Sequence, residues 1–178
     1  LPFKLELSDG TNVEITEQMV EKKMVHNNIA GEWFTPHVIE PAFGIDRIIW
    51  HILDHAYEET EKEGENYNLL KLKESVAPAD VIVLPLFEKD GMGMAARKLN
   101  SQINQIKGIK CLIDSSKSIG RRYARADEIG VPWAITVDHQ SLDDNTVTIR
   151  RRDDQKQIRA EINELLILIN SNMISTLF

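Results

Sequence analysis

The chain has 178 residues, of which 42% are hydrophobic, and its formal net charge at pH 7 is −7. This length and composition suit one large domain or two small ones with apolar cores, and they exclude a disordered tail. No apolar run approaches the roughly 18–20 residues of a membrane-spanning helix, so the sequence predicts a cytoplasmic protein without a membrane partner. The single cysteine, Cys111, excludes an internal disulfide framework and a cysteine-rich metal site.

Charge is distributed unevenly along the chain. Residues 1–75 carry 7 Lys and Arg against 15 Asp and Glu, whereas residues 76–178 carry 14 against 13. The second part also contains two basic clusters, KSIGRRYAR (117–125) and RRRDDQKQIR (150–159). This asymmetry predicts two modules with different partners.

The first part of the chain contains signals for strands and one helix. Alternating apolar residues around Asp9-Gly10 predict a hairpin over 3–15. Prolines near both ends of 33–39 favour an extended strand there. Apolar residues at helical spacing from Ile45 onward predict a helix with Arg47 in its first turn. The acidic segment 58–67 is interpreted as a solvated helix end and loop.

The second part alternates between strand and helix patterns, and Ala77-Pro78 marks its boundary. The chain is therefore divided into domains 1–77 and 78–178. Strands are expected at 80–86, 109–114, 131–138 and 145–151, and helices at about 92–107, 118–128 and 155–171. This alternation predicts an α/β fold, with a sheet covered by helices, in about 100 residues.

Three runs carry a resemblance to a known family. TPHVIEPAFGIDRI (35–48), DSSKSIGRRYARADEIGVPWAITVD (114–138) and RRRDDQKQIRAEINEL (150–165) resemble the C-terminal part of glycyl-tRNA synthetase, a class II enzyme, of the archaeal and eukaryotic kind. The resemblance implies that 1–77 is the end of a class II catalytic domain, with antiparallel strands and the motif 3 helix. It implies that 78–178 is an anticodon-binding domain with a mixed β-sheet and three helices.

The resemblance also implies roles for residues of the first part. Arg47 stands at the motif 3 position that contacts the triphosphate of ATP, and a guanidinium suits this role because it holds phosphate oxygens by paired hydrogen bonds. Glu40 stands where the family pairs with the ammonium group of glycine, and Pro41 and Ala42 complete the glycine contact. Ala42 replaces a serine that is common in the family, and Asp46 replaces a glycine. No catalytic group is assigned to the chain.

The anticodon of tRNA(Gly) is the partner that the resemblance implies for the second part. Unstacked bases are read by arginine forks on their edges and by flat side chains that stack on them. The residues expected in this role are Arg121, Asp138, His139 and Arg152. On chemistry alone, the basic helix face that carries Arg121 and Arg125 could equally be a solvated surface.

The complete family enzyme activates glycine with ATP and Mg²⁺, transfers it to tRNA, and is a homodimer. The first two class II motifs have no counterpart here, so we expect the chain alone not to activate glycine. Two alternatives stay open. One is a non-catalytic nucleic-acid-binding accessory protein on the same scaffold, and the other is a plain interaction module with solubilising basic faces.

Two pairs of residues allow a purely structural interpretation. Glu40 and Arg47 could form an ion pair at a strand-to-helix turn. His51 and His55 have the i, i+4 spacing of a zinc pair, but no third ligand accompanies them in a recognisable pattern. We therefore expect no metal site.

Overall fold

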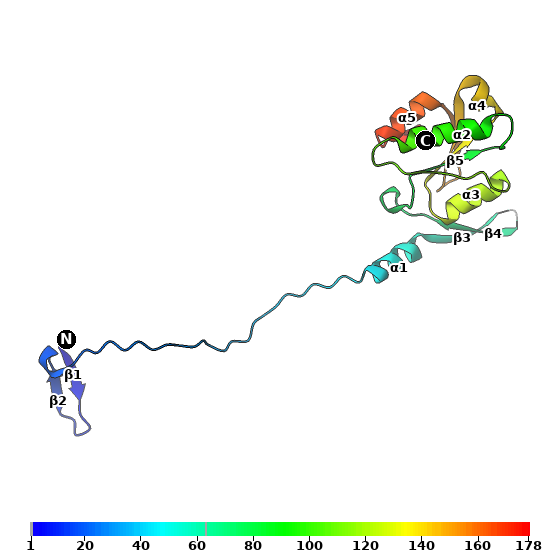
Figure 1. Ribbon diagram of the computed structural model, residues 1–178. Helices are drawn as coiled ribbons and strands as arrows, with labels where there is room; N and C mark the ends of the chain where they lie inside the picture. Colours follow the sequence, from blue (N-terminus) through cyan, green and yellow to red (C-terminus); the bar gives the residue numbers. More distant parts are fainter. Residues whose placement is uncertain (1, 63) are drawn as a thin grey trace. The chain divides into compact units, whose positions relative to one another are not determined.

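The computed structural model describes residues 2–62 and 64–178. The chain divides into two compact units, Leu1–Ala42 and Phe43–Phe178, which are described separately (Figure 1). Within the described residues, no helix is both long and apolar enough to cross a membrane. All the described α-helices belong to the second unit.

The first unit contains the expected hairpin. Strands β1 (Phe3–Glu6) and β2 (Asn12–Ile15) pair antiparallel, with Phe3 opposite Ile15. The turn between them is stabilised by Asp9, whose Oδ1 accepts a hydrogen bond from the Thr11 amide at 2.9 Å. A 3₁₀ turn, η1 (Glu17–Met19), follows β2. The prediction of a hairpin over 3–15 is thus confirmed.

The strand expected over 33–39 is not formed. This segment has no regular secondary structure, and Trp33 and Ile39 are fully exposed. A strand needs a neighbour that accepts and donates its backbone hydrogen bonds. In the described part of the first unit, no second segment pairs with 33–39, so its extended preference produces no strand.

The second unit starts with a helix and a second hairpin. Helix α1 (Ile45–Ala56) has Arg47 in its first turn, as predicted, and most of its apolar stripe is exposed. It continues directly into β3 (Tyr57–Lys62), which pairs with β4 (Glu65–Leu70). The expectation of a loop over 58–67 is therefore wrong. The acidic residues concealed the hairpin, because β3 lacks the apolar alternation by which strands are recognised.

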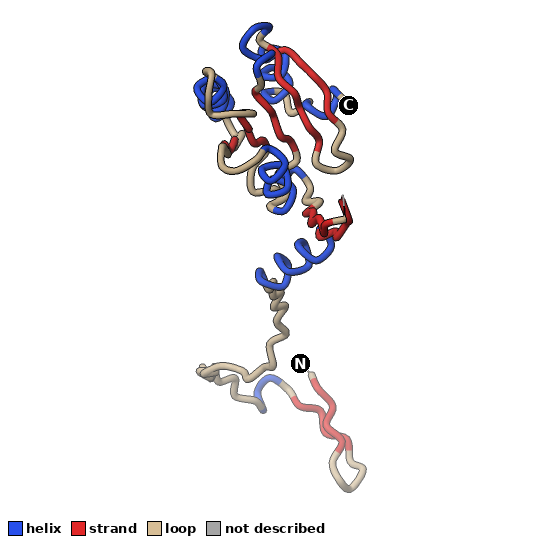
Figure 2. The backbone as a smooth tube through the Cα atoms, turned by 90° about the vertical axis from the view of Figure 1, so that its right-hand side faces the viewer, coloured by secondary structure: helices blue, strands red, loops and turns tan. Residues whose placement is uncertain are grey.

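A five-stranded mixed sheet forms the centre of the second unit, which confirms the predicted fold class (Figure 2). The strand order is β6-β5-β7-β8-β9, with the first three parallel and the last two antiparallel to their neighbours. The strands are β5 (Val81–Pro85), β6 (Cys111–Ile113), β7 (Trp133–Val137), β8 (Thr146–Arg151) and β9 (Gln157–Glu161). Cys111 is buried in the strand at one edge of this sheet.

Helices cover both faces of the sheet. α2 (Met92–Asn104) and α5 (Ile162–Asn170) pack on one face, where the larger apolar core lies, and α3 (Ile119–Glu128) packs on the other (Figure 1). A short helix, α4 (His139–Asp144), connects β7 to β8. The 3₁₀ turns η2 (Glu74–Val76) and η3 (Ile174–Leu177) complete the unit.

The last part of the sheet differs from the sequence prediction. A helix was expected over about 155–171, but β9 occupies its first part and α5 begins only at Ile162. Ile158 and Ala160 point to the core on alternate positions of a strand, and Ile158 pairs with Ile149 of β8. Pairing with β8 thus fixes these residues as a strand.

Candidate functional site

In this fold, ligands commonly bind beside the carboxyl ends of the parallel strands. We call this end of the sheet the carboxyl edge and the opposite end the amino edge. Strand β5 leads into α2 on one face of the sheet, whereas β6 leads into α3 on the other. The chain runs from β5 to its neighbour β6 on one side and from β7 to its neighbour β8 on the other, so a topological switch point, where open α/β sheets commonly bind ligands, lies between β5 and β7. Phe87 lies two residues after the end of β5, and Asp138 and His139 directly follow β7.

Two exposed rings meet at this switch point. The ring centroids of Phe87 and His139 lie 6.3 Å apart, with their planes inclined by 45°. Phe87 is 55% exposed, and His139 is exposed as well, so neither ring is used by the core. Exposed flat side chains can stack on unpaired bases. His139 was predicted from the sequence but Phe87 was not, although it directly follows the strand expected at 80–86.

Asp138 caps the N-terminus of α4, and this cap positions His139, the first residue of the helix. Its Oδ1 accepts hydrogen bonds from the amide and the hydroxyl of Ser141, both at 2.9 Å. The Arg159 guanidinium donates to both carboxylate oxygens of Asp138, at 2.8 and 2.9 Å. Hydrogen bonds from Arg159 hold the pKa of the Asp138 carboxyl well below its usual range; partial burial opposes this shift, and hydrogen bonds from Ser141 add to it. Asp138 is therefore an ionised, well-anchored carboxylate.

Arg159→Met is expected to remove a stabilising contribution that is present at neutral pH and fades in acid. The folded-state pKa of Asp138 lies below the unfolded value of about 4, so its carboxylate stabilises the fold above that pH and loses this contribution as the pH falls further. The difference in free energy of unfolding between wild type and variant should be largest near neutral pH and shrink below about pH 4. Urea denaturation across this range measures the difference.

Lys98→Met is the matched control for this measurement. The Lys98 ammonium forms no ion pair within residues 2–62 and 64–178, so its removal takes away one cation without releasing a carboxylate. Its effect should not vary with pH in this way. A difference for Arg159→Met that stays constant from neutral pH into acid would contradict the assigned role of Asp138.

The first turns of α3 bring three arginines to the same edge, but only one is available to a ligand. Arg122 is buried and donates to the carbonyl oxygens of Pro85 and, at 3.0 Å, of Lys117. Arg125 forms a salt bridge with Asp114. Arg121 is exposed, and the described part of the chain gives its guanidinium no hydrogen bond or ion pair. Arg121 is thus free to bind an acceptor on another molecule.

Arg152 lies apart from the other predicted anticodon residues. It follows β8, and its amide donates to the carbonyl oxygen of Pro132 before β7, so it lies at the amino edge of the parallel strands. The side chain is only 4% exposed. Its guanidinium donates at 2.8 Å each to the carbonyl oxygens of Gly130 and Leu72. The structure therefore places Arg121, Asp138 and His139 at the carboxyl edge and Arg152 at the amino edge.

The residues expected to contact glycine and ATP belong to different units. Glu40, Pro41 and Ala42 lie in the irregular end of the first unit, and Arg47 lies in α1 of the second. All four are exposed.

The described residues contain no group of three His, Cys, Asp or Glu side chains that could hold a metal ion. In the histidine pair of α1, His55 Nδ1 lies 2.8 Å from the carbonyl oxygen of His51 and forms a hydrogen bond with it. This local contact accounts for one of the two ring nitrogens of His55.

The fold and this edge define a class of protein. Residues 80–172 match the anticodon binding domain family, and the chain belongs to that family. Two solved structures share the fold: the RNA binding domain of threonyl-tRNA synthetase from Cryptosporidium parvum (TM-score 0.52, 21% identity, 57% of this chain and 25% of that one) and prolyl-tRNA synthetase from the same organism (TM-score 0.50, 20% identity, 60% and 24%).

More similar sequences are those of glycine–tRNA ligases, which confirms the resemblance drawn from the sequence. The chain is 43% identical over 165 residues to the glycine–tRNA ligase of Methanothrix thermoacetophila, covering 93% of this chain and 28% of the relative. It is 48% identical over 158 residues to that of Methanocaldococcus jannaschii, covering 89% and 26%. The chain thus spans about a quarter of the length of these relatives.

Proposed function

We propose that this chain is part of a glycine–tRNA ligase and that residues 78–178 recognise the anticodon of tRNA(Gly). The observation that carries the proposal is the pair of exposed rings, Phe87 and His139, at the switch point of an anticodon-binding fold. The relatives named glycine–tRNA ligase support the choice of tRNA. The start of the family match at residue 80 supports the boundary between 1–77 and 78–178.

The carboxyl edge carries the kinds of side chain that recognise unpaired bases. An unstacked base lies against the rings of Phe87 and His139, which stack on it whatever its sequence. Arg121 uses its unpaired fork on a base edge or a phosphate. Asp138 and Arg159 form a fixed pair beside the rings and limit which base edges fit. Arg152 supports the domain from within, because its burial removes it from direct contact with RNA.

The first part of the chain supplies contacts to glycine and ATP in the complete ligase. Arg47 binds the triphosphate from the first turn of α1, where the helix dipole also favours an anion. Glu40 pairs with the ammonium group of glycine, and Pro41 and Ala42 line the same pocket. Mg²⁺ accompanies ATP, the complete ligase is a homodimer in the cytoplasm, and the isolated chain does not activate glycine.

Binding of anticodon stem-loops tests this function. The glycine tRNA stem-loop should bind at least about tenfold more tightly than one in which a cytosine at the second or third anticodon position is changed. Fluorescence anisotropy across a salt series measures both affinities. Phosphate contacts weaken with salt for either RNA, so only the difference between them reports base recognition.

Arg121→Ala should reduce this difference, because Arg121 lies on the binding edge with a free guanidinium. Lys107→Ala is the control, since Lys107 is an exposed cation in the loop between α2 and β6, at the opposite edge. Its loss should leave the discrimination intact. Equal binding of both stem-loops would overturn the proposal and favour a nucleic-acid-binding accessory protein.

A further inference from the structure

A buried polar network joins the β3–β4 hairpin to the sheet. Tyr67 of β4 donates its hydroxyl to Asp127 of α3, and Asp127 accepts two hydrogen bonds from Arg150 of β8, at 2.8 and 2.9 Å. Asp127 is 1% exposed and Arg150 is 2% exposed. We call Tyr67, Asp127 and Arg150 the buried triad, after the two buried members; the Tyr67 side chain itself is half-buried. In such a site each contact polarises the next, so displacing one member disturbs the others.

The hydroxyl of Tyr67 acts as a donor in this network. Burial raises the pKa of Tyr67 well above its usual range, and the hydrogen bond to the Asp127 carboxylate raises it further. Tyr67 therefore stays protonated, and its single proton points to Asp127. Removal of this hydroxyl would break its hydrogen bonds with Asp127 and Arg150 without removing the buried ion pair.

The same network extends to the carboxyl edge of the sheet. The guanidinium carbon of Arg150 lies 4.8 Å from the centre of the Tyr123 ring, and the Tyr123 hydroxyl is hydrogen-bonded to Thr136. Thr136 is in β7, two residues before Asp138, which begins α4. Side-chain contacts thus connect β4 with Thr136, and the backbone of β7 leads from Thr136 to Asp138 at the proposed anticodon edge.

A second contact holds the segment after β4. Arg152 bridges the carbonyl oxygens of Leu72 and Gly130. Gly130 has φ +83°, and a Cβ there would lie 2.7 Å from Leu72 Cδ1. Another residue would be strained by this positive φ and would push Leu72 aside, so glycine suits the close packing of this segment on the end of α3. Two points of attachment, at Tyr67 and at Leu72, fix β4 on the domain.

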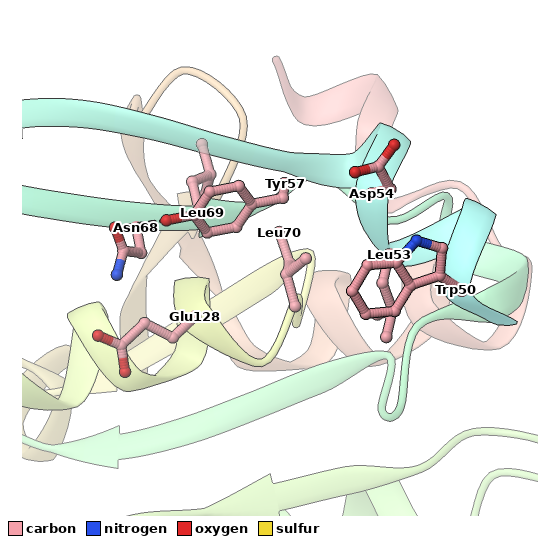
Figure 3. A pocket seen from close by; sticks show the side chains of 8 residues that line it. All are labelled: Trp50, Leu53, Asp54, Tyr57, Asn68, Leu69, Leu70 and Glu128. Carbon is pink, nitrogen blue, oxygen red and sulfur yellow. Dashed lines mark hydrogen bonds between the residues drawn. The ribbon is translucent and has the colours of Figure 1, made fainter.

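Buried apolar side chains, Leu69 and Leu72, also contribute to this joint, which borders an open space. An open, largely apolar cavity of about 510 Å³ lies between α1, the hairpin and the end of α3 (Figure 3). It is lined by Trp50, Leu53, Asp54, Tyr57, Asn68, Leu69, Leu70 and Glu128. The polar contacts named above therefore act together with these buried leucines in placing the hairpin.

The β3–β4 hairpin also holds the C-terminal end of α1. The helix ends at Ala56, β3 begins at the next residue, and the Lys71 amide donates to the Ala56 carbonyl oxygen at 2.7 Å. Helix α1 also carries Arg47. We propose that the buried triad is a positioning device that couples occupancy of the anticodon edge to the β3–β4 hairpin and to α1. This inference rests on the proposed recognition of the anticodon.

Hydrogen exchange of residues 45–70 tests the coupling in the 178-residue chain. Saturation with the glycine tRNA stem-loop should slow exchange of the hairpin and the last turn of α1 by about fivefold or more. In Tyr67→Phe, this slowing should fall below about twofold while the stem-loop affinity is unchanged. A triad that only stabilised the fold would raise exchange in the free variant but preserve the ratio between free and bound chain.

Tyr57→Phe is the matched control. The Tyr57 hydroxyl donates to Asn68 Oδ1 at 3.2 Å within the same hairpin and does not touch the triad. This variant should keep the slowing, which would support the assignment to Tyr67.

Three outcomes would overturn the inference. Unchanged exchange in the wild type despite sequence-dependent binding would refute the coupling and leave the proposed function standing. Slowing that persists in Tyr67→Phe would remove the triad as its route. Binding that ignores the anticodon sequence would refute the proposed function, and the coupling with it.

Discussion

Asp127→Ala should lower the free energy of unfolding of this chain by about 3–5 kcal/mol, the range for breaking a buried ion pair from one side. The substitution leaves the Arg150 guanidinium buried without its carboxylate and takes the acceptor from the Tyr67 hydroxyl. The Arg150 side chain is 2% exposed, so its guanidinium cannot reach water without opening the contact between α3 and the sheet. Urea denaturation followed by circular dichroism measures the loss.

Two further variants separate charge from packing in this experiment. Asp127→Asn keeps the shape and one acceptor but not the charge, so it should be less stable than wild type and more stable than Asp127→Ala. Asp154→Ala removes the carboxylate partner of Arg151 at the surface and should have a much smaller effect, because water replaces that contact. A loss below about 1 kcal/mol for Asp127→Ala would show that the pair is not structurally important.

The double variant Phe87→Ala/His139→Ala should weaken binding of the glycine tRNA stem-loop by about 1–3 kcal/mol, roughly 5- to 150-fold. The two rings are exposed and touch each other, so their removal takes away the stacking surface and leaves the core intact. The free energy of unfolding should change little. Fluorescence anisotropy gives the affinity, and each single variant should fall between wild type and the double variant.

The control for the two rings lies in the first unit. Phe34→Ala/His26→Ala removes the same two side-chain types from exposed positions that the proposal gives no part in RNA binding. Its stem-loop affinity should equal that of wild type. Similar weakening in both double variants would mean that the rings of the carboxyl edge have no specific part in binding.

Local patterns in the sequence were sufficient for most of the second unit. The periodicity after Ile45 and the alternation of strands with helices after residue 78 correspond to α1 and to the mixed sheet. The error at β9 arises because one pattern of apolar residues fits both a helix and a strand. Ile158, Ile162 and Leu165 are spaced as on a helix face, yet Ile158 belongs to β9. Only pairing with β8, a contact between distant segments, decides between the two.

The candidate site was predictable only in part for a similar reason. Asp138 and His139 directly follow a predicted strand, so their position at a sheet edge could be derived from sequence. The burial of Arg152 could not, because its acceptors, Gly130 and Leu72, are 22 and 80 residues away along the chain. Arg122 and Arg125 likewise look free in the sequence, and only the structure shows their partners.

Because Cys111 is buried, its reaction with alkylating reagents can be used to measure opening of the sheet. It is the single cysteine of the sequence, it is 6% exposed, and burial raises the pKa of its thiol to about 12. The thiolate that alkylating reagents attack is therefore almost absent while the edge strand β6 is in place. The rate of alkylation consequently reports how often this edge of the sheet opens, in the unmodified protein and without any engineered label.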